Sequence, residues 1–290
     1  MSFMRGYFMK YVVVGDLHIK YTAPIFRKET YFSELCNKID QINIIAKENN
    51  AKVICLGDFF NSYVEDYFES IMYELADRVY GWTSLIGNHD CKDIDGNLKG
   101  TSFGILHKMD YIRTDSFPGL DFFHYYNRKD FTGKSNNKIA FIHDYIMPKG
   151  TKEKFEYKEC FENDYRIVFC GHYHYPFDIL LGHTRYINPG SLMRSTITEL
   201  KLKRTPEVIL VDDATFETQH IPLKVKPLEE ISNPLEENKL DSTFESKFVD
   251  MLLKNDLTGD SNDIINLLQK NNVDSKLVEY IKAKLEEVEK

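Results

Sequence analysis

The sequence predicts a mixed α/β fold in which a largely parallel sheet carries a polar site along one edge. Three observations support this. Strand-like apolar runs alternate with amphipathic helical segments, five of these runs end in residues of metal-ligand type, and a hairpin-like pair of runs follows later in the chain. Strands that alternate with helices form parallel pairs with right-handed crossovers. Ligands of such open sheets bind beyond the carboxyl ends of the strands.

The N-terminal part of the chain supplies three strands and two helices. The predicted helices carry apolar residues every three or four positions along one face. Each predicted strand is a short apolar run that stops at a glycine. In chain order these elements are Tyr11–Val14, the helix Lys28–Asn49, Lys52–Leu56, the helix Ser62–Tyr80 and Trp82–Ile86.

The following part, Cys91–Asn137, is less regular and contains several glycines and a proline. A hairpin is expected to finish a second sheet, because its two runs flank the turn-forming stretch Asp212–Thr215. The strands predicted after Cys91 are Leu120–Tyr126, Ile139–Ile142, Ile167–Cys170, Arg185–Asn188, Glu207–Val211 and Phe216–Pro222.

Three regions are expected along the chain: a main domain (1–225), a linker (226–241) and a small C-terminal helical tail (242–290). The linker is rich in proline and glutamate near its start. Ser242 and Glu245 match a capping box at the start of the tail. Residues 1–8 are expected to lie outside the core.

Composition indicates a globular protein of the cytoplasm. Hydrophobic residues make up 42% and charged residues 28% of the chain. No apolar run approaches the roughly 18–20 residues of a membrane span, and no secretory signal is recognisable at the N-terminus. The richness in Asn, Lys, Ile, Tyr and Phe is typical of an AT-rich genome, so a phage-encoded protein of the host cytoplasm fits as well. The five cysteines show no CxxC spacing and are expected to be free thiols.

The net charge of −8 is unevenly distributed. Residues 226–290 hold 9 Lys/Arg and 15 Asp/Glu, a net charge of −6, which leaves −2 for residues 1–225. Two bound divalent cations would reverse the sign of that remainder. An anionic substrate is therefore compatible with the main domain.

The polar clusters at the strand ends predict a metal centre. Residues two apart in an extended segment point to the same side, so Asp16 and His18, and likewise His172 and His174, can converge on one ion. Carboxylate, imidazole and amide donors without thiolate suit manganese, iron or zinc. Seven such residues are too many for one ion and match two ions that share a carboxylate. The five clusters are Asp16/His18, Gly57-Asp58, Gly87-Asn88-His89-Asp90, His143-Asp144 and Gly171-His172-Tyr173-His174.

As a set, these motifs resemble the calcineurin-like metallophosphoesterases, whose pattern is DxH, GDxx, GNH(D/E), a lone His and GHxH. The resemblance covers about residues 1–191, including the turn Asn188-Pro189-Gly190-Ser191. It implies a four-layer sandwich of two mixed β-sheets flanked by helices. It also implies a phosphoester hydrolase with two divalent metal ions, with Mn²⁺ expected and Fe²⁺, Zn²⁺ or Mg²⁺ as alternatives.

The resemblance further implies a role for each motif residue. His89 would donate a proton to the leaving oxygen or clamp the phosphoryl group, and Asp90 would orient His89. One metal would be held by Asp16, His18, Asp58 and His174, and the other by Asp58, Asn88, His143 and His172.

Within this superfamily the chain looks most like the SbcD-type DNA repair nucleases, because of Gly57-Asp58-Phe59-Phe60-Asn61 and the two closing strands. Asn61 occupies a place near the scissile phosphate and is a candidate substrate contact. The resemblance implies DNA as substrate and an SMC-like SbcC-type ATPase as partner of residues 242–290, while a homodimer and a tail folded onto its own domain stay open.

Two other functions also stay open: a stand-alone phosphodiesterase or pyrophosphatase acting on small nucleotides, and an inactive scaffold. Candidate phosphate contacts outside the motifs are basic residues in two runs, Lys149, Lys152 and Lys154, and Lys201, Lys203 and Arg204.

Overall fold

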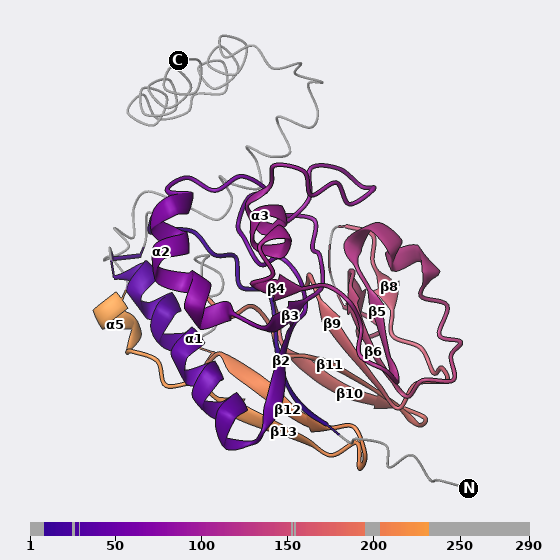
Figure 1. Cartoon of the computed structure of the whole chain (residues 1–290). Helices are drawn as coiled ribbons and strands as arrows, with labels where there is room; N and C mark the ends of the chain where they lie inside the picture. The colour runs from indigo at the N-terminus through magenta and orange to yellow at the C-terminus, as the bar shows by residue number, and fades with distance from the viewer. Residues whose placement is uncertain are drawn as a thin grey trace, which may run out of the picture. The chain divides into compact units, whose positions relative to one another are not determined.

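The computed structural model describes residues 9–24, 27–28, 30–151, 153, 155–194 and 204–231. These residues form two mixed β-sheets with helices packed on the first (Figure 1). The predicted α/β fold with two mixed sheets and flanking helices is therefore confirmed. The predicted tail, most of the predicted linker and residues 1–8 lie outside the described residues.

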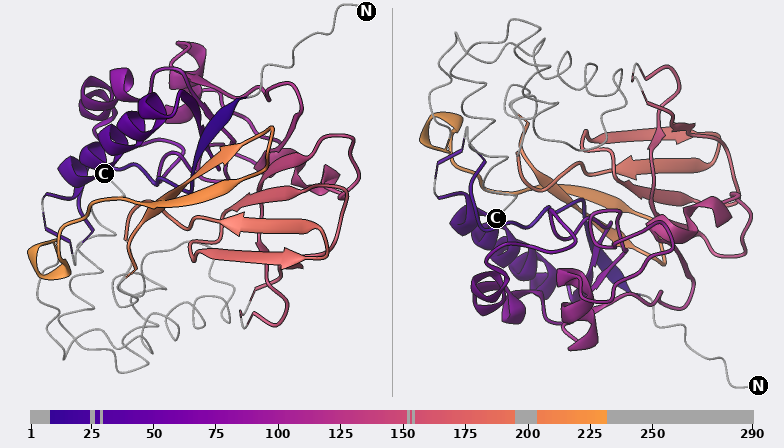
Figure 2. Two further views of the ribbon diagram at one scale, coloured as in Figure 1. Left: turned by 90° about the horizontal axis from the view of Figure 1, so that it is seen from below. Right: turned by 90° about the horizontal axis from the view of Figure 1, so that it is seen from above.

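The first sheet has six strands in the order β13-β12-β1-β2-β3-β4. The pairs from β1 to β4 are parallel, whereas β12 runs antiparallel to β1 and to β13. Figure 2 shows the β12–β13 hairpin in orange beside the indigo β1. The prediction that this hairpin finishes a second sheet is therefore wrong, because β12 pairs with β1 and extends the first sheet. The strands are Lys10–Val14 (β1), Ala51–Cys55 (β2), Trp82–Ser84 (β3), Ile112–Arg113 (β4), Glu207–Asp212 (β12) and Thr218–Pro222 (β13).

The second sheet has five strands in the order β10-β11-β9-β6-β5. The pairs from β11 to β5 are parallel, and β10 is antiparallel to β11. These strands are Leu120–Phe123 (β5), Ile139–His143 (β6), Ile167–Gly171 (β9), Phe177–Leu181 (β10) and Thr184–Asn188 (β11). A separate pair joins Ile146–Met147 (β7) to Lys158–Glu159 (β8).

Alternation along the strands divides the core into layers. On β1, Val12 and Val14 pack with the helices, whereas Tyr11 and Val13 pack with side chains of the second sheet. The far face of the second sheet is covered by residues such as Phe131. Because side chains on a strand alternate between its two faces, one apolar run can supply two core layers. The helices are α1 (Tyr31–Glu48), α2 (Phe68–Val79), α3 (Ser102–Lys108), α5 (Leu228–Ile231) and the 3-10 helix η1 (Tyr125–Asp130).

Several predicted elements were too long, among them one helix and one strand. The helix predicted from Ser62 begins at Phe68, because Tyr67 adopts a left-handed conformation with φ 58°. The preceding loop satisfies its backbone through Glu65, whose carboxylate accepts a hydrogen bond from the Ser62 amide. The strand predicted to reach Tyr126 ends at Phe123, where η1 follows.

Several elements of the described residues were not predicted, among them α3 and β10. Helix α3 lies in the glycine-rich stretch and is capped by Thr101, whose Oγ1 accepts a hydrogen bond from the Gly104 amide at 2.9 Å. Strand β10 pairs with β11 at an edge of the second sheet.

In the predicted linker, Ile231 of α5 is buried and its carbonyl accepts a hydrogen bond from the Lys28 amide at 3.0 Å. The five cysteines are free and buried, as predicted.

Candidate metal centre

The polar residues that follow β1, β2, β3, β6 and β9 meet in space although they come from two sheets. His143, the last residue of β6, is in register with Gly171 of β9, which places His172 next to it. Three residues of the cluster have a left-handed backbone, His18 (φ 46°), Asp58 (φ 45°) and His172 (φ 78°). Non-glycine residues rarely adopt this conformation, and it concentrates at functional sites.

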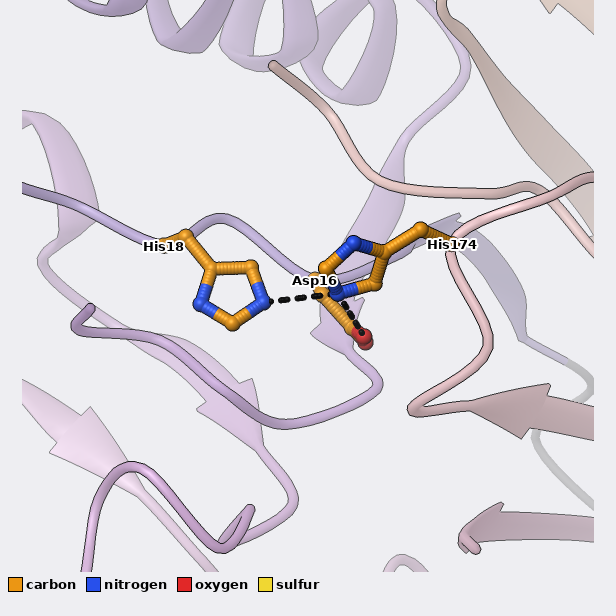
Figure 3. A group of neighbouring side chains, drawn as sticks. All are labelled: Asp16, His18 and His174. Carbon is orange, nitrogen blue, oxygen red and sulfur yellow. Dashed lines mark hydrogen bonds and ion pairs between the residues drawn. The ribbon is translucent and has the colours of Figure 1, made fainter. Parts of the chain in front are cut away.

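Asp16, His18 and His174 form the first candidate metal site (Figure 3). The Nε2 atoms of the two histidines lie 2.9 Å apart, and Nε2 of His174 lies 3.7 Å from Oδ2 of Asp16. The Asp16 carboxylate also accepts a hydrogen bond from the His172 amide at 2.9 Å. The DxH and GHxH motifs, 156 residues apart, therefore supply one donor set.

Asp58, His143 and His172 form the second candidate site. Nε2 of His143 lies 3.4 Å from Oδ1 of Asp58, and Nδ1 of His172 lies 3.9 Å from Oδ2 of Asp58. The side-chain oxygen of Asn88 lies 3.2 Å from Nε2 of His143. The Nδ1–H of His143 donates to the Leu56 carbonyl at 2.7 Å, which leaves Nε2 free to bind a cation.

Asp58 lies between the two sites. Its Oδ2 is 3.7 Å from Nε2 of His18, a residue of the first site, in addition to its contacts in the second. Its carboxylate is held by the His89 amide, which donates to Oδ1 at 2.9 Å. Gly87 allows this approach, because a Cβ there would lie 2.0 Å from the same Oδ1. The seven residues predicted as ligands are thus brought together in two groups that share Asp58.

The electrostatics of these groups fit two divalent cations. Burial lowers the pKa of His18 to about 3 and that of His172 to about 4, so both imidazoles are neutral electron-pair donors at neutral pH. Burial also lowers the pKa of His143, but the carboxylates of Asp58 and Asp16 outweigh this effect and raise it to about 9. Burial raises the pKa of Asp58, but the facing His143 and the other histidines lower it by more, so this pKa is held well below its usual range. A proton on His143 therefore occupies a place that a cation would take.

His89 is anchored differently from the prediction. Its Nδ1–H donates to the backbone carbonyl of Asn61 at 2.5 Å, and its ring packs edge-on against His18 with centroids 4.8 Å apart. One donor atom of His89 also groups with donors of His18 and Asp58. The backbone of Asn61, rather than its side chain, is thus what holds His89.

The prediction that Asp90 orients His89 is wrong. The Asp90 carboxylate is fully buried and accepts hydrogen bonds from the backbone amides of Gly87 (2.9 Å), Phe60 (3.0 Å) and Phe59 (3.2 Å). Because these three amides are buried and need an acceptor, they draw the carboxylate away from the imidazole. Asp90 therefore joins the loop after β2 to the loop after β3.

Lys38 supports the first site, which the sequence analysis did not predict. Its ammonium group is buried and donates to the Leu192 carbonyl at 3.0 Å. The Leu192 amide in turn donates to the Asp16 carbonyl at 2.8 Å, and the Ser191 amide donates to the His174 carbonyl at 3.1 Å. The sequence signal that could have indicated this role is a lysine among the apolar positions of the predicted helix, three residues after Leu35.

His124 similarly supports the loop that carries Asn88. Its Nδ1 accepts a hydrogen bond from the Ile86 amide at 3.0 Å, and the Tyr125 amide donates to the Ile86 carbonyl at 2.9 Å. No sequence motif marks this histidine. Of the basic runs considered as phosphate contacts, Lys149 is exposed and Arg204 donates to Ser191, whereas Lys152, Lys154, Lys201 and Lys203 lie outside the described residues.

Comparison with protein families gives a match over most of the described domain. The model of the calcineurin-like phosphoesterase superfamily domain matches residues 9–212. The chain therefore belongs to the calcineurin-like phosphoesterase superfamily, and it is a metallophosphoesterase whose candidate His/Asp clusters correspond to the dinuclear metal site of that superfamily. No protein with a curated description matches the sequence.

Several solved structures resemble the fold at low sequence identity. An archaeal phosphodiesterase is 17% identical, with a TM-score of 0.41, over 74% of this chain and 100% of the other. A hypothetical protein of Pyrococcus horikoshii OT3 is 15% identical, with a TM-score of 0.37, over 77% and 91%. A Vps29 mutant from Entamoeba histolytica is 15% identical, with a TM-score of 0.33, over 74% and 100%. These similarities do not distinguish among substrates. In the described part of the chain, no helix is long and apolar enough to cross a membrane.

Proposed function

We propose that this protein is a dinuclear-metal phosphodiesterase that acts as an SbcD-like DNA nuclease, with exonuclease or endonuclease activity in DNA repair, recombination or replication. The observation that carries the proposal is the arrangement of two His/Asp groups around the shared Asp58, with His89 beside them. Mn²⁺ is the proposed metal, because its preference for mixed oxygen and nitrogen donors matches the set.

The two cations, when bound, would polarise the phosphoryl oxygens and lower the pKa of a water molecule for in-line attack. The protein groups hold the other parts of the reaction. Because the Asn61 carbonyl occupies Nδ1 of His89, only Nε2 remains to deliver a proton to the leaving oxygen or to hold the phosphoryl group. Asp58 keeps the two donor groups at a defined separation through its bond from the His89 amide.

Two features support a DNA substrate. The segment Gly57–Asn61 and the closing hairpin β12–β13, which carry the resemblance to SbcD-type nucleases, both lie in the described domain. The hairpin extends the first sheet next to β1, the strand that leads to Asp16. The side chain of Asn61 is a proposed contact to the substrate near the scissile phosphate.

A partner ATPase of the SbcC type is proposed to bind residues 242–290. The test is a truncation after Ile231, which keeps the bond from the Lys28 amide to the Ile231 carbonyl. The truncated protein is expected to hydrolyse a small model diester as the full chain does and to lose co-purification with an SMC-like ATPase. Loss of the diesterase activity would show instead that the tail belongs to the catalytic domain.

The function is tested by Mn²⁺-dependent cleavage of end-labelled linear duplex and single-stranded DNA, beside a cyclic dinucleotide and a model diester. His89→Ala serves as the inactive control. Cleavage of DNA by the wild type alone, with binding that weakens steeply as salt increases, would support the nuclease. Hydrolysis of the small diesters without cleavage of DNA would indicate a phosphodiesterase of small nucleotides instead. Inactivity on all substrates would favour an inactive scaffold.

A further inference from the structure

Aromatic rings extend outward from the candidate metal centre on the side of His172. The ring centroid of Tyr145 lies 3.7 Å from that of His172, and the ring of Phe155 lies 4.4 Å from that of Tyr145. Tyr125 approaches the same histidine at 6.0 Å. These three aromatic residues come from the start of η1, the loop after β6 and the loop before β8. The arrangement links a candidate metal ligand to the protein surface through tilted ring contacts.

The outer ring of this series is not part of the core. Phe155 is 42% exposed, and neither Tyr145 nor Phe155 belongs to the three buried hydrophobic clusters of the described residues. A large aromatic side chain left open to water beside a ligand site is available for contact with that ligand. Burial within the fold therefore does not account for Phe155.

Several charged groups near these rings have partners within the protein. Lys158 pairs with Asp144 at 2.8 Å, and Arg128 pairs with the same carboxylate at 3.4 Å while lying 3.8 Å over the Tyr125 ring. Glu153, on the loop that carries Phe155, accepts a hydrogen bond from the Tyr173 hydroxyl at 3.2 Å. Lys158, Arg128, Asp144 and Glu153 are thus engaged within the protein, which leaves the exposed ring face as the feature of this surface that a ligand can meet.

We propose that Tyr145 and Phe155 form a stacking platform for a nucleobase of the diester whose phosphoryl group is held at the metal centre. This inference rests on the proposed phosphodiesterase function and names the side chains that hold a base of its nucleotidyl substrate. Every base has a π-face, so stacking on aromatic side chains tolerates any sequence. The platform selects nucleotides over simple phosphodiesters and shows little preference among bases.

The kinetic test compares two diesters that release the same 4-nitrophenolate: thymidine 5′-(4-nitrophenyl) phosphate and methyl 4-nitrophenyl phosphate. In Phe155→Ala, the ratio of kcat/KM for the nucleoside diester to that for the methyl diester is expected to fall about 5- to 150-fold, the range for removal of a stacked base. Phe155→Trp is expected to restore the ratio. Tyr73→Ala, which removes an 89% exposed ring on α2, is the matched control and keeps the wild-type ratio. An unchanged ratio in Phe155→Ala, whether both rates stay the same or fall by the same factor, would overturn the proposal.

A binding test separates this inference from the proposed activity. The chain has one tryptophan, Trp82, which is 3% exposed, so Phe155→Trp introduces an accessible fluorophore over a nearly constant background. Titration with thymidine 5′-monophosphate in the presence of Mn²⁺ is expected to quench this fluorescence, whereas inorganic phosphate leaves it unchanged. Quenching without hydrolysis of either diester would refute the phosphodiesterase while retaining the platform. Equal responses to nucleotide and phosphate, or no response to the nucleotide, would refute the platform.

Discussion

Asp90→Asn tests how the two loops of the metal centre are joined. In the structure, Oδ2 of Asp90 accepts from the Gly87 and Phe59 amides, and Oδ1 accepts from the Phe60 amide. Asparagine keeps the size of the side chain and one of the two oxygens. With that oxygen in the Oδ2 position, the new NH₂ group faces the Phe60 amide, donor against donor.

The expected loss of stability follows from this geometry. One buried N–H without an acceptor costs about 1–3 kcal/mol. We therefore expect the free energy of unfolding to fall by about 1–3 kcal/mol. Because Asn88, His89 and Asp58 belong to the loops that Asp90 joins, metal affinity is expected to drop about 10- to 100-fold, as for loss of other outer partners of metal sites.

Urea denaturation followed by Trp82 fluorescence and calorimetric titration with Mn²⁺ measure the two effects. Asp95→Asn, an exposed substitution of the same kind, is the control and should change neither quantity. If Asp90 oriented His89 instead, Asp90→Asn would slow diester hydrolysis while unfolding and metal affinity stayed at wild-type values. That pattern would refute the assignment drawn from the hydrogen bonds.

Three further substitutions test other parts of the centre. His89→Ala is expected to lower kcat for a model diester by about 10²- to 10⁴-fold with the metal content by mass spectrometry unchanged, and wild-type turnover would contradict its assignment. Gly87→Ala places a Cβ 2.0 Å from Oδ1 and 2.2 Å from the amide nitrogen of Asp58, so calorimetric titration should show a large loss of metal affinity; wild-type binding would contradict the close approach. Burial and the nearby Arg194 lower the pKa of Lys38 from 10.5 to about 7, so between pH 7 and 9 the unfolded chain binds more protons than the folded one. The free energy of unfolding of the wild type should therefore rise with pH relative to that of Lys38→Met, by up to about 1.4 kcal/mol per pH unit. Urea denaturation at several pH values measures this difference, and a difference that does not change with pH would refute the lowered pKa.

The residues of the candidate site were readable from the sequence because each follows a strand. Asp16, Asp58 and Asn88 each follow the glycine that ends an apolar run, and the carboxyl ends of parallel strands meet at one edge of a sheet. His143 and His172 follow runs of the same kind. Grouping these residues at one site needed only the strand pattern and the types of side chain.

The boundaries of several elements were not readable for physical reasons. Ser62–Tyr67 has helical spacing but adopts a loop, because Glu65 bonds to the Ser62 amide and the Glu65 amide donates to Ser102 at 2.9 Å. Ser102 is far along the chain and belongs to a helix that glycines obscured. Local propensity was overridden by tertiary hydrogen bonds.

What the sequence by itself determined is the set of side chains that reach the edge of the sheets, since hydrophobic periodicity and glycine positions are local properties. What only the tertiary structure decided is the partner of each side chain. His18 faces His174 across 156 residues of chain, and Asp90 bonds to the amides near Asp58 rather than to His89. Such contacts depend on how the two sheets pack and on which buried amides need acceptors, and no local sequence pattern encodes either of these.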